Sequence, residues 1–182
     1  IIFTIYSKGA LLSKSTGGDF FVSDELRDKV REGNFRTVDE ITAVLKEAGD
    51  DDLRGIDFDD SRVSYCGFPG DADPDTINAW MKLCEAINKA CISQKKVLPK
   101  RNTEPNEKFS LHVWLTQIWM SGPDLKEERK IYYRNLTGHT AFRTKADEEK
   151  WKQHQAEKRA KLKAAKEQDS DSTEESEGEA DE

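Results

Sequence analysis

Apolar residues recur at helical spacing through the middle of the chain, and this pattern constrains the fold more than any other feature. From residue 77 to residue 92 they lie three or four positions apart. The sequence therefore predicts a long helix that opens at Asp75 and ends before Pro99. The apolar positions of this helix are Ile77, Trp80, Met81, Cys84, Ile87, Cys91 and Ile92.

The segment 107–120 fits two patterns. Alternating apolar residues from Phe109 to Leu115 (Phe109, Leu111, Val113 and Leu115) are typical of a strand, whereas another set fills the helical template i, i+3, i+4, i+7, i+8. We favour the helix, because Ser-Gly-Pro follows at 121–123 as a helix stop. The residues that fill the helical template are Leu111, Trp114, Leu115, Ile118 and Trp119.

Capping residues mark three further helices in the same part of the chain. A Ser, Thr or Asp before an apolar-periodic stretch satisfies the first free backbone N–H groups, and a Gly often follows the last turn. The expected boundaries are Ser23 to Gly33, a Thr37–Glu40 capping box to Gly49, and Asp124 with Glu127 at the third position.

The first seven residues, IIFTIYS, are rich in β-branched and aromatic side chains, so we expect a short strand stopped by Gly9. Residues 50–75 hold nine Asp and are expected to form an acidic loop, with a strand at 62–66. The predicted fold is therefore mainly α, with about five core helices and a small β element near the N-terminus. Trp80, Trp114 and Trp119 fall at predicted core positions.

Charge divides the chain into three parts. Residues 1–142, 143–166 and 167–182 carry net charges of −3, +5 and −9. The last part has one aliphatic residue and no aromatic one, so it cannot bury enough apolar surface to offset the entropy of ordering. We predict a mainly helical globular domain at 1–140, a basic charged helix at 141–166 and a disordered acidic tail at 167–182.

The basic helix is expected to open at Thr144 and to run toward Lys166. It offers little to a core, but Glu148 with Lys152, and Glu157 with Lys161, stand at the favourable i, i+4 spacing. Such a helix projects from a domain or docks on a partner. In the tail, Ser172 and Ser176 each precede an acid by three residues, which is typical of sites for an acid-directed kinase.

Several classes of site lack support in the sequence. The three Cys are widely spaced without a CxxC motif, and the Asp-rich stretch at 71–82 has Thr76 and Lys82 where a calcium-binding EF-hand needs Gly and Glu. The three His fall in different predicted elements, and no GxSxG or phosphate-binding glycine motif occurs. No apolar run approaches the length of a membrane span. We therefore expect no catalytic residue, metal or cofactor.

Bases interleaved with aromatic residues give the main functional lead. Lys and Arg neutralise nucleic-acid phosphates and release counterions, while aromatic rings stack on unpaired bases. The expected nucleic-acid-binding residues are Lys126, Arg129, Lys130, Tyr132, Tyr133, Arg134, Arg143, Lys145, Lys150, Trp151, Lys152, Lys158, Arg159, Lys161 and Lys163.

These features predict a non-enzymatic, intracellular protein of the cytoplasm or nucleus that binds or packages RNA or DNA. A viral nucleocapsid or coat-like subunit, able to form homo-oligomers, shares them. The alternative is a protein-interaction module whose acidic tail engages a basic partner such as a histone. Since the sequence starts at Ile1 rather than Met, we interpret it as a processed product or a fragment, and a third alternative is an accessory piece of a larger enzyme.

Overall fold

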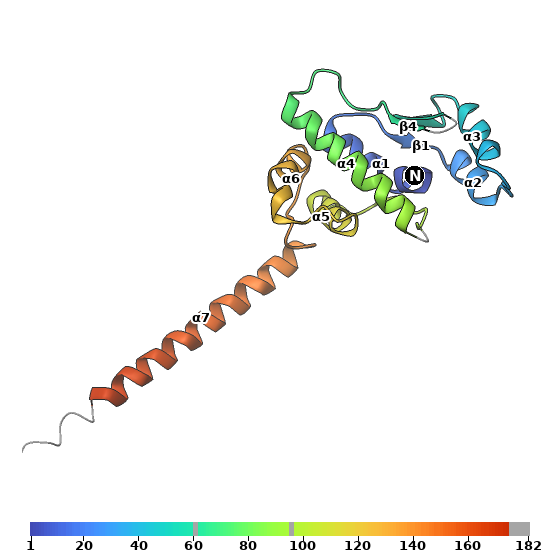
Figure 1. The fold of residues 1–182 in the computed structure, drawn as a ribbon. Coiled ribbons are helices and arrows are strands. Elements are labelled where there is room, and N and C mark those ends of the chain that lie inside the picture. The colour runs from blue at the N-terminus through green and yellow to red at the C-terminus, as the bar shows by residue number, and fades with distance from the viewer. Residues whose placement is uncertain (60–61, 95–96, 175–182) are drawn as a thin grey trace, which may run out of the picture. The chain divides into compact units, whose positions relative to one another are not determined.

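A computed structural model describes residues 1–59, 62–94 and 97–174. It divides into two compact units, 1–140 and 141–182. The described elements are α1 (Ile2–Thr16), β1 (Phe21–Val22), α2 (Asp24–Glu32), α3 (Val38–Lys46), β2 (Leu53–Arg54), β3 (Ile56–Asp59), β4 (Arg62–Tyr65), α4 (Pro74–Ser93), α5 (Glu107–Gln117), the 3₁₀ turn η1 (Pro123–Leu125), α6 (Lys126–Tyr133) and α7 (Lys145–Glu174) (Figure 1).

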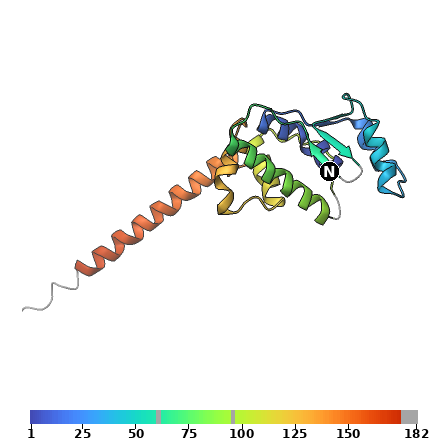
Figure 2. The same ribbon diagram turned by 45° about the horizontal axis from the view of Figure 1, so that its top comes forward.

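The first unit is mainly helical, as predicted. Helix α6 contacts both α4 and α1, while α2 and β1 contact α1 elsewhere. In Figure 1 and Figure 2, α5 and α6 lie on one side of α4, and the β3–β4 hairpin with α2 and α3 lies on the other. The strands form two antiparallel pairs, β1 with β2 and β3 with β4.

The predicted strand at the N-terminus is wrong, because residues 2–16 form helix α1. β-Branched residues favour a strand only where another strand can pair with them, and the burial of α1 follows helical spacing instead. Gly9 lies inside the helix, which ends at Gly17 in the left-handed conformation. The side chains that α1 buries at this spacing are Ile2, Ile5, Tyr6 and Leu12.

Close backbone packing joins the segment after α1 to Gly55, between β2 and β3, and to Gly67, after β4. The N–H of Asp19 donates to the carbonyl of Gly67 at 2.8 Å, and the N–H of Gly67 donates to Gly55 at 3.0 Å. A Cβ at Gly67 would lie 2.3 Å from the Asp19 oxygen, and Gly55 has a φ of +80°. Gly55 and Gly67 admit only glycine. The close approach of the backbone at Asp19, Gly55 and Gly67 therefore depends on these two residues.

Most predicted helix starts are confirmed. The side chain of Ser23 accepts from the Leu26 N–H at 3.0 Å, and Thr37 accepts from Glu40 at 3.3 Å. Residues 107–117 are helical, as favoured, and β4 matches the strand expected at 62–66. The expected Asp124 cap is wrong, because Asp124 lies in η1 and α6 has no side-chain cap.

Helix α4 starts at Pro74 rather than at Asp75, and it buries fewer of its apolar side chains than the sequence predicted. Its cap is Asp73, not Asp75, and the hydrogen bonds from Thr76 hold the pKa of the Asp73 carboxyl below its usual value. Trp80 and Trp114 are buried, as predicted, but Trp119 is 61% exposed. Trp119 follows α5 with a φ of +60°, so it leaves the helical face on which its spacing had placed it. The other residues of the predicted apolar faces that are exposed are Ile77, Met81 and Ile92.

In the second unit, α7 begins where the sequence predicted. The Thr144 hydroxyl accepts from the N–H of Asp147 at 3.1 Å, which caps the first turn. The helix continues past the predicted end at Lys166 to Glu174. Ser172 lies in this last stretch, and Ser176 lies outside the described residues.

Candidate nucleic-acid interface

The aromatic residues of α6 belong to the first unit's interior. Tyr132 is 1% exposed, and its hydroxyl donates to the Ala79 carbonyl at 2.5 Å. Burial raises the pKa of Tyr132, so the phenol stays protonated. Tyr133 is half-buried, and its hydroxyl lies 3.0 Å from Nδ1 of His112. Tyr132 therefore cannot stack on a nucleic-acid base, and this expectation of the sequence is corrected.

Two predicted bases of α6 make internal contacts. The guanidinium of Arg129 donates to the carbonyls of Met120 at 3.1 Å and Gly122 at 2.6 Å, which fixes the turn between α5 and α6. Lys130 pairs with Glu127 at 2.8 Å. The two remaining bases, Lys126 and Arg134, are exposed.

The surface around α6 carries more acid than base. A hollow of about 470 Å³ lies beside α6. Glu128 is paired with Lys82, and that hydrogen bond holds the pKa of Glu128 below its usual value, so it is ionised at neutral pH. Four acids and two bases line the hollow, which disfavours a phosphate group there: Asp73, Asp75, Glu127, Glu128, Lys130 and Arg134.

Helix α7 presents the other predicted bases to solvent. Between residues 150 and 163 there are six bases and one acid. Every predicted binding residue of this unit has an exposed side chain. These residues are Arg143, Lys145, Lys150, Trp151, Lys152, Lys158, Arg159, Lys161 and Lys163.

Four of these bases share one face of α7, which we name the basic stripe: Lys145, Lys152, Arg159 and Lys163. They stand at i, i+7, i+14 and i+18, which the 3.6-residue turn places within a narrow angular range, over about 27 Å of helix. Lys152 also pairs with Glu148 at 2.7 Å, as the i, i+4 spacing predicted.

Trp151 is half-exposed on the same helix. Its ring lies 5.5 Å from that of Phe142, centroid to centroid, and 50% of the residue is exposed. The Phe142 contact orients one side of the indole, and the exposed part of the ring offers an apolar surface to solvent.

The Cys84 thiol is partly buried in the first unit. Burial raises the pKa of the Cys84 thiol to about 12, so it is not a nucleophile at neutral pH. Among residues 1–59, 62–94 and 97–174, no three Cys, His, Asp or Glu side chains lie close enough together to hold a metal ion.

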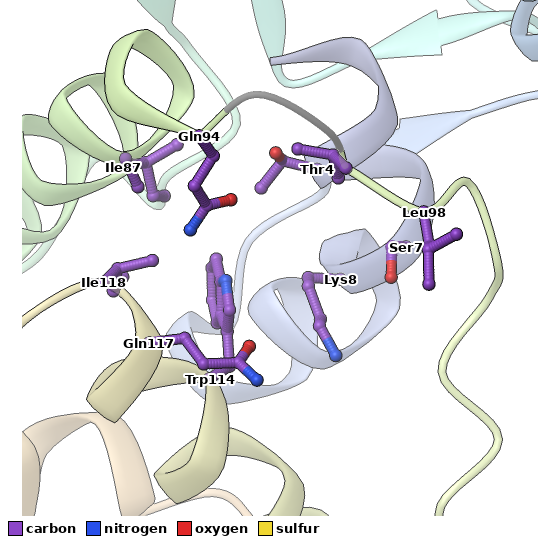
Figure 3. Close-up of a pocket in the computed structure, with 11 residues that line it drawn as sticks. Thr4, Ser7, Lys8, Ile87, Gln94, Leu98, Trp114, Gln117 and Ile118 are labelled. Atoms are coloured by element: carbon purple, nitrogen blue, oxygen red, sulfur yellow. The ribbon is translucent and has the colours of Figure 1, made fainter.

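No pattern in the sequence predicts the cavity of about 520 Å³ that the first unit contains (Figure 3). Its walls come from α1, the end of α4 and the segment after it, and α5, so the residues that line it are far apart in the chain. Among the described residues that line it, Lys8 is the only charged one. Helical periodicity marks Ile87 and Trp114 as core residues but cannot show that they border the same space.

Within the described residues, no helix has the length and apolar character needed to cross a bilayer. Comparison of the chain with protein-family models, with curated proteins and with solved structures finds no match.

Proposed function

We propose that this protein binds the phosphate backbone of RNA or DNA through the basic stripe of α7, and that it does not catalyse a reaction. The observation that carries the proposal is the concentration of exposed bases at 150–163, six against one acid, on a helix that buries none of them. Exposed Lys and Arg side chains at this density can neutralise nucleic-acid phosphates and release their counterions.

Binding of this kind is electrostatic and tolerant of sequence. The stripe spans about 27 Å, long enough to follow several phosphates of a single strand or one side of a duplex. Trp151 adds a stacking surface for an unpaired base, which favours single-stranded ligands. Sequence-independent binding suits packaging, as in a nucleocapsid-like subunit of the cytoplasm or nucleus.

The test is a fluorescence-anisotropy titration of labelled single-stranded RNA and duplex DNA at about 50 and about 200 mM salt. Each phosphate contact with a single strand contributes about −0.7 to the slope of log K against log salt, so four stripe contacts give about −3. The affinity for RNA should then fall about 50-fold over this range. A salt-independent affinity, or no binding at all, contradicts the proposal.

A double variant with two reversed charges tests whether the basic stripe is the binding surface. The double variant Arg159→Glu/Lys163→Glu should lose about half of the salt slope, because two of the four contacts are removed. The control is Lys29→Glu/Lys100→Glu, which makes the same change in net charge at two exposed lysines of the first unit. If the control weakens binding as much as the stripe variant, net charge rather than the stripe is responsible.

A second candidate function rests on the acidic end of the chain. Residues 167–182 hold nine acids and no base, which suits a basic protein partner such as a histone. Removing residues 167–182 separates the two proposals. Nucleic-acid affinity should rise or stay unchanged on truncation, whereas affinity for a histone should be lost.

A further inference from the structure

Within the part of the chain that the structure describes, the cavity of the first unit holds a cation, Lys8, without a counterion. Of the lysines on α1, Lys14 pairs with Glu107 at 2.5 Å, but Lys8 has no ion pair with any residue in the described ranges. No Asp or Glu is among the described residues that line the cavity. Burial lowers the pKa of Lys8, because its ammonium has lost part of its water.

The rest of the lining is apolar with a few amides and hydroxyls. Ile87 faces the space from α4, and Trp114 and Ile118 face it from α5 and from the residue that follows α5 (Figure 3). The side chain of Gln94 extends from the end of α4 into the same space, and Gln117 stands beside Trp114. Ligand sites typically combine such apolar walls with a few polar groups that orient the ligand.

We propose that this cavity binds a small carboxylic acid with an apolar body. The carboxylate lies on the Lys8 ammonium, with the amide of Gln117 as a second donor, and the apolar body packs against Ile87, Ile118 and Trp114. The single ammonium among the described lining residues matches the single negative charge of a carboxylate. The cavity volume of about 520 Å³ lies within the usual range for small-molecule sites.

Calorimetric titration of the full chain with decanoate tests this proposal, with decanol as the uncharged ligand of equal length. Decanoate should bind saturably and at least about tenfold more tightly than decanol, because only the carboxylate pairs with the ammonium. The variant Lys8→Met keeps an unbranched apolar side chain and removes the charge. It should lose at least about tenfold in decanoate affinity and leave decanol binding unchanged.

Two further variants locate the site. Lys29→Met removes an exposed lysine of α2 and should leave decanoate binding as in the wild type. Gln117→Trp places a larger ring at the cavity from an exposed position of α5 and should abolish binding of both ligands. The proposal is overturned if decanoate does not bind, if decanol binds equally well, or if either cavity variant binds as the wild type does. Should Lys8→Met fail to fold, the two-ligand comparison and Gln117→Trp still decide the question.

Discussion

Gly9 is the position at which the packing of α1 can be tested most directly. A Cβ at Gly9 would lie 2.6 Å from the carbonyl oxygen of Phe20 and 3.4 Å from Cγ2 of Ile5. The Phe20 backbone cannot easily retreat, because its N–H donates to the Ser13 hydroxyl at 2.8 Å, which in turn donates to the Gly9 carbonyl at 2.9 Å. Phe20 itself is 2% exposed.

Two opposing effects decide the result of Gly9→Ala. Alanine in a helix interior is favoured over glycine by about 1 kcal/mol. Overpacking against a fixed group costs about 1–3 kcal/mol, and a backbone oxygen at this distance places the variant at the upper end. We therefore expect the free energy of unfolding to fall by about 1–2 kcal/mol.

Urea denaturation followed by tryptophan fluorescence and circular dichroism measures this change. The control is Gly49→Ala, since a Cβ there would meet no atom within 4 Å. The control should be neutral or stabilising, by up to about 1 kcal/mol. If Gly9→Ala stabilises the protein as much as the control does, α1 does not pack on the Phe20 backbone, and the reasoning is refuted.

Three other predictions follow from the described contacts. Tyr132→Phe should lower the free energy of unfolding by about 1–2 kcal/mol, because the Ala79 carbonyl loses its buried donor; nucleic-acid affinity measured by anisotropy should not change. The pKa of Glu128 is lowered by Lys82, so this carboxylate stabilises the fold above its ordinary pKa of 4.5, and the contribution is lost as the pH falls through the lower folded value. Glu128→Gln should therefore flatten the acid side of a stability-against-pH curve, and an unchanged curve would contradict the pairing. Raising the salt concentration should weaken RNA binding strongly and change the melting temperature little, since the basic stripe lies on an exposed helix.

Local patterns in the sequence were sufficient for the elements whose partners lie within a few residues. The Ser23 and Thr37 caps depend on hydrogen bonds to residues three positions away, and both form as predicted. The exposed bases of α7 follow from composition, because a stretch with almost no apolar side chains has nothing to bury. Helices α4 and α5 were likewise apparent from their apolar spacing.

What the sequence left open depends on residues that are far apart in the chain. The N-terminal segment is a helix because Ile5 and Leu12 pack into a core that later segments complete, while the described strands pair with one another. Trp119 is exposed because a single positive φ turns it away from the face of α5, which spacing alone does not reveal. Tyr132 and Lys8 acquire their surroundings only from tertiary packing. Tyr132 becomes a buried donor to α4, and Lys8 comes to line a cavity whose other described walls are apolar and neutral polar side chains.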